Sequence, residues 1–313
     1  MARPPKELCV LVFIPAVMFP WVFFQQESST RWDKVAARLS GPLAGDDPRV
    51  LQVVTDTYLD PPSTLPYNLS TNLRYSTGKD QFTWPWIHHF LQLLFSEQRG
   101  GFFVEAGALD GEYLSNTLWL EQELGWTGLL IEADVINYKA LRDTHRRAWS
   151  SNTCLSSELY PKDTLFVSRF TKIQTNLSPW AARSHGHELR DDVNQSKHDI
   201  LDDTSYSTVQ CLPLVSYLAA LTVSSVDLLS LDIQGTEAFV IRNFLTSSNI
   251  TIRVIVAENE YNQFDDEFMS LMRDKGYVVL AAAIDYVFVR RDDSLMTRPE
   301  VQRLLLKTNS SKV

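Results

Sequence analysis

The segment 102–134 constrains the fold more than any other part of the chain. It contains a short apolar run rich in strand-forming residues, a turn with two glycines, an amphipathic segment with leucines at helical spacing, and a second apolar run that ends in an acid. The amphipathic segment, 113–124, predicts a helix that ends before Gly125. Glycine is common just past the end of a helix. This order is typical of the first βαβ unit of a nucleotide-binding α/β domain.

The glycine turn and the acids beside it form the first candidate binding site. Gly107 and Gly111 lack a Cβ and would let the backbone approach a ligand closely. The electropositive end of the following helix would favour a carboxylate or a phosphate. Glu105 ends the first strand, and Glu132 ends the second, where it could accept hydrogen bonds from a ribose. The alternative is a tight turn that binds no ligand. The third glycine of the dinucleotide pattern is absent, which disfavours a dinucleotide-dependent oxidoreductase.

Four blocks of the chain resemble the FkbM-type methyltransferases, within which the likeness is closest to the branch that includes the invertebrate protein Star. The blocks are Val104–Glu112, Ser115–Leu118, Gly125–Ala133 and Ser230–Glu237. The resemblance implies an α/β fold of class I methyltransferase type, a Rossmann-like three-layer sandwich with a mostly parallel seven-stranded sheet. We expect runs 277–282 and 285–290 to form its terminal antiparallel hairpin.

The resemblance also implies S-adenosylmethionine as the cofactor and O-methyl transfer to an unknown hydroxyl as the reaction. Asp232 would face the transferred methyl or its acceptor, and Glu258 is the other catalytic acid in reach. Glu132 would hold the ribose, and Ser156, directly after the expected third strand (149–155), would contact the adenine. The implied cofactor-binding residues are Glu105, Gly107, Gly111, Glu132 and Ser156.

One departure from the family pattern keeps a second function open. The family usually carries D-x-E-G-A-E after its fourth strand, whereas this chain has Asp232-Ile-Gln234-Gly-Thr-Glu237. The glutamine removes a carboxylate that could matter for substrate or metal binding. The alternative is a non-enzymatic, Star-like factor that moves a membrane-tethered protein cargo from the endoplasmic reticulum to the Golgi and endosomes, because a fold does not determine an activity.

The N-terminus predicts a membrane anchor. Residues 8–24 form an apolar run without charge, about 25 Å long as a helix, at the short end of the membrane-spanning range. Its bulky aromatic end favours a retained signal anchor over a cleaved signal peptide. We therefore expect a single-pass type II protein of the endoplasmic reticulum, Golgi, endosome or plasma membrane. The expected parts are a cytosolic tail (1–7), the anchor (8–24), a stem or lid (25–80), the FkbM-like domain (81–295) and a C-terminal helix and tail (296–313).

Sequons and cysteines agree with a lumenal or extracellular domain. Four N-x-S/T acceptors are expected to carry glycans: Asn68, Asn194, Asn249 and Asn309. Two of the three cysteines lie beyond the apolar run, and we expect Cys154 and Cys211 to form a disulfide. The alternative is a pair of buried thiols.

Charge and histidine placement limit the remaining functions. A net charge of −9 argues against nonspecific nucleic-acid binding, which needs a basic face. Segment 172–207 is irregular and holds His185, His187 and His198 among acids. A mobile lid over the cofactor cleft is favoured there, and a metal site is the alternative. We expect no metal.

Overall fold

The computed structural model describes residues 38–70, 84–170, 183–189 and 203–310. The chain divides into two compact units, 1–38 and 39–313, and the elements below belong to the second. The described helices are α2 (Pro48–Val53), the π-helical turn η1 (Val54–Tyr58), α3 (Pro85–Phe95), α4 (Leu118–Leu124), α5 (Val135–Asp143), α6 (Leu214–Ala220), α7 (Glu237–Ser247), α8 (Asp266–Asp274), the 3₁₀ turn η4 (Ser294–Thr297) and α9 (Pro299–Ser310). The described strands are β1 (Phe102–Ala106), β2 (Thr127–Ile131), β3 (Trp149–Ser151), β4 (Cys154–Leu155), β5 (Lys162–Phe170), β6 (His187–Glu188), β7 (Asp203–Leu212), β8 (Ser225–Leu231), β9 (Thr251–Glu258), β10 (Tyr277–Ala282) and β11 (Asp285–Arg290).

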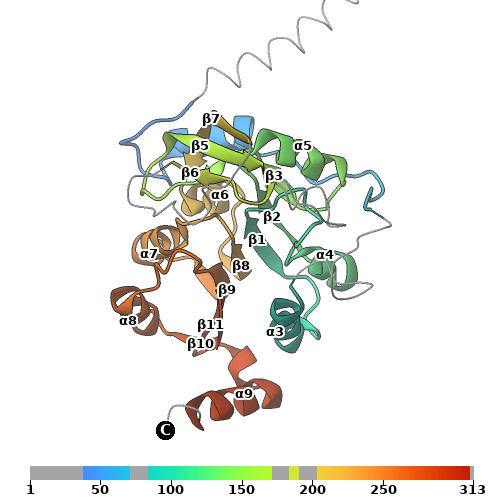
Figure 1. The fold of residues 1–313 in the computed structure, drawn as a ribbon, viewed down its shortest axis with the longest axis vertical. Coiled ribbons are helices and arrows are strands. Elements are labelled where there is room, and N and C mark those ends of the chain that lie inside the picture. Colours follow the sequence, from blue (N-terminus) through green and yellow to red (C-terminus); the bar gives the residue numbers. More distant parts are fainter. Residues whose placement is uncertain (1–37, 71–83, 171–182, 190–202, 311–313) are drawn as a thin grey trace, which may run out of the picture. The chain divides into compact units, whose positions relative to one another are not determined.

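The larger sheet has seven strands in the order β10-β11-β9-β8-β1-β2-β3 (Figure 1). Strand β11 runs antiparallel to both of its neighbours, and the other pairs are parallel. The expected mostly parallel sheet with a terminal hairpin is therefore confirmed, with the hairpin at the residues that the sequence indicated. This order is consistent with the class I methyltransferase fold.

Helices cover both faces of this sheet, because alternate side chains of its strands point to opposite faces. Val104 packs in a core with residues of α6, α7 and α8. Phe103, its neighbour, packs in a second core with residues of α3, α4, α5 and α9. Figure 1 shows α7 and α8 on one side of the central strands and α3 and α4 on the other. The three-layer arrangement is therefore present.

Helix α4 begins later than the spacing of leucines predicts. The expected helix was 113–124, but the observed one is Leu118–Leu124. Leu114 has a positive φ of 57°, which is outside the helical region. The Ser115 hydroxyl and the Asn116 backbone N–H donate hydrogen bonds to the Glu105 carboxylate, and the helix begins only after them. The predicted stop is confirmed, since Gly125 caps α4 in the left-handed conformation.

A second sheet of four strands, in the order β4-β7-β5-β6, was not predicted. The expected third strand, 149–155, is divided: β3 pairs with β2, whereas β4 pairs with β7. The Asn152 side chain donates to the carbonyl oxygens of Glu132 and Ala133 at 2.9 and 3.2 Å and holds the turn between the two. A disulfide joins Cys154 of β4 to Cys211 of β7.

Residues before α3, which were expected to form a stem or lid, include regular structure. Val50 of α2 and Val54 of η1 are fully buried in the first core. Asp60 and Ser150 exchange backbone hydrogen bonds of 2.8 and 3.0 Å. The predicted anchor, 8–24, lies outside the described residues. Among the described helices, none has the length and apolar character that crossing a membrane requires.

Candidate functional site

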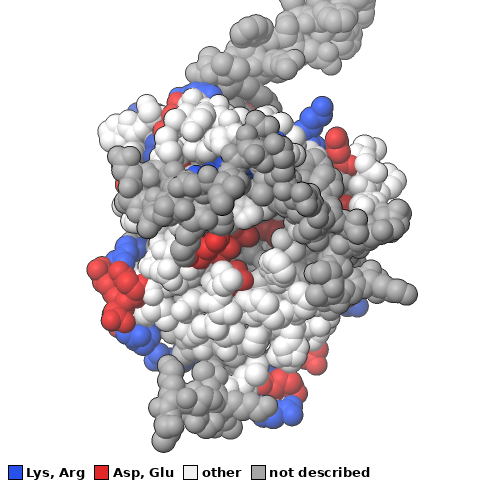
Figure 2. Space-filling model, viewed as in Figure 1, with Lys and Arg blue, Asp and Glu red and all other residues white. Residues whose placement is uncertain are grey.

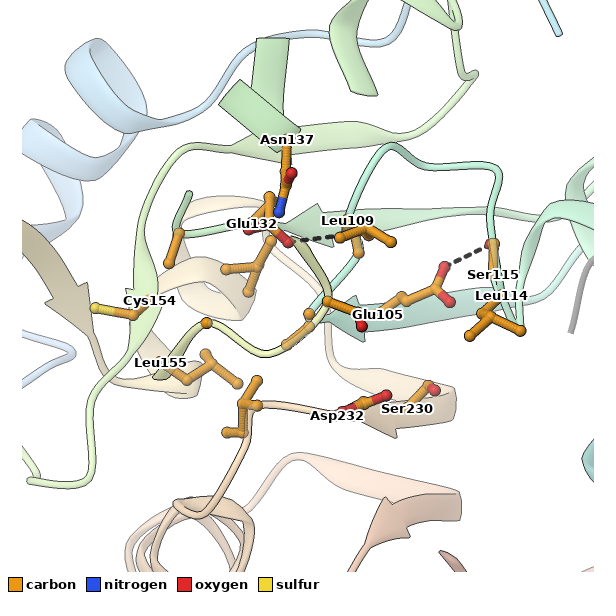
Figure 3. Close-up of a pocket in the computed structure, with 18 of the residues that line it drawn as sticks. Glu105, Leu109, Leu114, Ser115, Glu132, Asn137, Cys154, Leu155, Ser230 and Asp232 are labelled. Carbon is orange, nitrogen blue, oxygen red and sulfur yellow. Dashed lines mark hydrogen bonds between the residues drawn. The ribbon is translucent and has the colours of Figure 1, made fainter. Parts of the chain in front are cut away.

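A cavity lies at the carboxyl ends of β1, β2 and β8, the edge where ligands bind in open α/β sheets. Its empty volume, which includes open solvent, is about 940 Å³. In Figure 3, Leu155 lies on one side of Glu132 and Ser115 lies on the other, with Asp232 below them. The predicted cofactor and catalytic residues that line the cavity are Glu105, Gly107, Glu132 and Asp232.

Gly107 brings the end of β1 close to the end of β8. Its φ is +81°, and a Cβ at this position would stand 1.8 Å from the carbonyl oxygen of Asp232. No side chain fits there without moving backbone. Gly111 also has a positive φ, of 75°, but it faces Leu141 and Arg146 and does not line the cavity. The structure therefore assigns the close approach to Gly107 and leaves Gly111 with a role in the turn.

The Glu105 carboxylate organises the loop that follows the glycine turn. Its Oε1 accepts a hydrogen bond from the backbone N–H of Asn116 at 2.6 Å, and its Oε2 accepts from the hydroxyls of Ser115 and Thr117 at 2.8 and 2.5 Å. Burial raises the pKa of Glu105, while the charge of Arg146 and these hydrogen bonds oppose that rise. The Glu105 carboxylate therefore holds loop 115–117 in place, and the residue also lines the cavity.

Arg146 supports this loop from behind and was not identified from the sequence. Its side chain and that of Glu121 are each 1% exposed and form an ion pair of 3.0 Å. The guanidinium also donates to the carbonyl oxygen of Gly111 and, at 3.1 Å, to the Thr117 hydroxyl. In the sequence, Arg146 is one of several basic residues of an expected helix, 135–148, for which a solvated face is favoured. The buried arginine lies past the end of α5, where periodicity alone does not reveal its direction.

Glu132 lies at the end of β2 with its carboxylate directed at the glycine turn (Figure 3). Oε2 accepts from the backbone N–H of Leu109 and Oε1 from that of Asp134, both at 2.8 Å. Burial raises its pKa to about 8, although these two hydrogen bonds and one from the Asn137 side chain oppose the rise. An ionised carboxylate accepts about four hydrogen bonds, so acceptor capacity remains for a ligand hydroxyl.

Asp232 and Glu258 form a pair held by one amide. The Nε2 of Gln234 donates to Asp232 Oδ1 at 2.7 Å and to Glu258 Oε2 at 2.9 Å. Asp232 lines the cavity and keeps solvent-exposed surface, whereas Glu258 lies behind it and is half-buried. Surrounding protein atoms desolvate both carboxyls and raise both pKa values, and the charge of Asp232 adds to the rise at Glu258. A proton is therefore retained in this pair near neutral pH.

Further acids surround this pair. Burial raises the pKa of Glu237 to about 7 and that of Asp285 to about 7, and the Asp232 charge adds to both effects. Figure 2 shows acidic side chains gathered near the centre of the face that it presents. Within the described ranges, no group of three histidine, cysteine or acidic residues is arranged to hold a metal ion. His185 and His187 lie in those ranges, and His198 does not.

Ser156, the predicted adenine contact, lies outside the cavity. Ser156 is buried, its hydroxyl donates to the carbonyl oxygen of Tyr160 at 2.9 Å, and it does not line the cavity. Thr153, Cys154 and Leu155 line the cavity instead. The reason is the division of the expected third strand, since β4 leaves the main sheet and directs the residues after it away from the cavity.

The second sheet and segment 183–189 close one wall of the cavity. This wall includes Phe166 of β5, Glu188 of β6 and Arg183. Arg183 pairs with Asp134 at 2.7 Å, and Asp134 also caps α5. Sequence reasoning missed all three wall residues. Segment 172–207, which holds Arg183 and Glu188, lacks the periodicity that would place a side chain, and Phe166 reaches the wall through the pairing of β5 with β6 and β7.

Comparison with known proteins gives the following matches. Residues 105–279, more than half of the chain, match the model of the methyltransferase FkbM domain. A solved structure of the METTL16 methyltransferase domain aligns with 86% of this chain and 92% of its own length, at 12% sequence identity and a TM-score of 0.36. No curated protein sequence matches the chain.

Proposed function

Because the chain belongs to the FkbM methyltransferase family, we propose that it binds S-adenosylmethionine in the cavity of Figure 3 and transfers a methyl group to a hydroxyl. One observation carries this proposal. The Glu132 carboxylate lies at the cavity between an apolar wall and the polar loop 115–117.

The donors and acceptors of the cavity fit the three parts of this cofactor. Leu155, Ile131 and Phe166 offer an apolar surface to a base, and Glu132 offers acceptor capacity to a ribose. Asn116 and Asp232 line the polar part, where the amino-acid end would lie. The glycine turn at Gly107 allows the backbone of β1 to border the ligand directly. The cofactor supplies an electrophilic methyl group, so the protein's task is to position the two reactants.

Asp232 is the residue that would receive the acceptor's proton. It is the member of the acidic pair that lines the cavity, and the Gln234 amide fixes one of its oxygens. Glu258, whose pKa is raised further by the Asp232 charge, keeps the shared proton and leaves Asp232 as the acceptor. A positioned carboxylate with a raised pKa is suited to accept a proton from a hydroxyl.

At about pH 9, where the Glu132 carboxyl is ionised, replacing Glu132 with glutamine is expected to weaken binding of S-adenosylhomocysteine by about ten- to a hundredfold, because one charged acceptor of the ribose is lost. The wild-type affinity should rise as the pH increases through about 8, where the carboxyl ionises, and level off above it. The variant should lose this pH dependence. Calorimetric titrations of the full-length chain measure both effects. They should cover about pH 6.5 to pH 9, a range that extends roughly one unit to either side of the pKa.

Glu158→Gln is the matched control, because Glu158 is exposed and does not line the cavity. It should bind as the wild type does. The assignment of Glu132 to the ribose would be contradicted if the Glu132 variant bound as tightly as the wild type, or if the wild-type affinity fell with rising pH.

A second candidate function is a membrane-anchored trafficking scaffold of the Star type. Its support is the Gln234 amide, which donates to both acids of the candidate catalytic pair and stands where the family usually has a carboxylate. For such a scaffold, the cavity would bind no adenosyl ligand, and wild-type titrations with S-adenosylhomocysteine at millimolar concentration would give no heat.

The lumenal or extracellular, type II placement is part of the same proposal. The Cys154–Cys211 disulfide supports an oxidising compartment. Asn249 is exposed between α7 and β9 and suits glycan attachment. Asn68 is exposed, but its amide donates to the carbonyl oxygen of Asp143 at 2.9 Å, so it suits attachment less well. Asn194 and the side chain of Asn309 lie outside the part of the chain that the structure describes.

Replacing Asn249 with glutamine should therefore increase the gel mobility of protein made in eukaryotic cells by the shift of one glycan. Endoglycosidase treatment of the wild type should remove the same shift. A protein whose mobility is unaffected by both the substitution and endoglycosidase treatment would contradict glycosylation at this site.

A further inference from the structure

The edge of the second sheet gives the cavity a planar aromatic wall. Phe166 of β5 and Glu188 of β6 are register partners across the antiparallel pair, and both line the cavity. Gly186 allows this arrangement, because a Cβ there would stand 2.8 Å from the Phe166 ring. The ring therefore lies against backbone at the cavity wall.

Within the described residues, hydrogen bonds reach only one oxygen of the Glu188 carboxylate. Oε1 accepts from the Lys162 ammonium at 2.6 Å and from the Thr164 hydroxyl at 2.9 Å. Oε2 is buried and has no hydrogen-bond partner among the described residues, and the residue as a whole is 8% exposed. Buried carboxylate oxygens are almost always hydrogen-bonded. An unsatisfied one in a residue that lines a cavity is therefore a candidate acceptor for a ligand donor.

We infer that Glu188 is a specificity residue for the base of the ligand: its Oε2 accepts a hydrogen bond from the exocyclic amino group of an adenine that lies beside Phe166. This inference rests on the proposed cofactor function. The apolar surface of Leu155 and Ile131 continues from Phe166 along the cavity, which suits the one aromatic part of an adenosyl ligand. A base with an oxygen in place of the amino group would set two acceptors against each other.

The test compares S-adenosylhomocysteine with S-inosylhomocysteine, which differs in that amino group. The wild-type full-length chain should prefer the adenosyl ligand by on the order of a hundredfold. In Glu188→Gln, the amide can donate or accept, so the preference should fall to within about threefold. Glu158→Gln should keep the wild-type preference. Calorimetry gives the dissociation constants without any need for methyl transfer.

A third ligand separates the base from the amino-acid end. Methylthioadenosine carries the base but no amino acid, and Glu188→Gln should weaken its binding as much as that of S-adenosylhomocysteine. If only the amino-acid-bearing ligand is affected, Glu188 contacts the ammonium group and the inference is overturned.

The wild-type measurements keep the inference and the proposed function distinct. Equal wild-type affinity for the adenosyl and inosyl ligands would overturn the role of Glu188 and leave the cofactor site intact, whether or not the variant folds. Absence of wild-type binding to all three ligands would overturn the proposed function itself.

Discussion

Gly107→Ala is expected to lower the free energy of unfolding by about 3–5 kcal/mol and to abolish S-adenosylhomocysteine binding. The added Cβ would stand 1.8 Å from the Asp232 carbonyl oxygen, and backbone cannot rotate away as a side chain does. The positive φ of 81° adds strain for any residue other than glycine. Relief of the contact must separate the ends of β1 and β8, which are neighbouring strands that both border the cavity. Chemical denaturation measures the loss of stability.

Gly125→Ala separates the clash from the strain. Gly125 has a similar φ of 67°, but no atom of the described residues lies within 4 Å of the position its Cβ would take. Its substitution should cost only about 1–2 kcal/mol and leave ligand binding intact. Equal losses in the two variants would show that the close approach of the two strands is not what makes Gly107 necessary.

Arg146→Met is expected to destabilise the domain by about 3–5 kcal/mol, because it leaves a buried carboxylate without its partner. Glu121 would lose its ion pair at 3.0 Å, and Glu105 would lose the charge that opposes the rise of its pKa. The loop bound by Glu105 should loosen as well, so ligand affinity should fall together with stability. Denaturant titration and calorimetry measure the two effects.

Two further variants test the cause. Arg290→Met removes an arginine whose partner, Asp292, is 68% exposed, and it should cost at most about 1 kcal/mol. Adding Glu121→Gln to Arg146→Met should restore part of the stability, because it removes the stranded charge. An Arg146 variant as stable as the Arg290 variant would mean that the buried pair contributes little.

The main sheet could be predicted because its strands are continuous apolar runs and its turns carry glycine. Segment 226–233, for example, is apolar enough to identify the central strand β8, and Gly125 marks the end of α4. The acids at strand ends, Glu132 and Asp232, were found for the same reason. Parallel strands bring their carboxyl ends to one edge, so the strand pattern alone was sufficient to place both residues at the cavity.

Other parts of the site depend on long-range contacts that no local pattern encodes. The family resemblance assigns Ser156 to the adenine on the assumption that 149–155 forms one strand, but the turn held by Asn152 divides that segment. Glu188 lies in a two-residue strand that exists only by pairing with β5. Arg146 is buried in an ion pair with Glu121, which lies 25 residues away in the sequence. Each of these positions is set by tertiary pairing, which overrides the local pattern.

A crystal structure of the full-length chain with S-adenosylhomocysteine tests the central claim most directly. The account predicts the ribose within hydrogen-bond distance of Glu132, the base beside Phe166 and Glu188, and the sulfur facing Asp232. A ligand bound in the reverse direction, at another place, or absent from the cavity at millimolar concentration would contradict it.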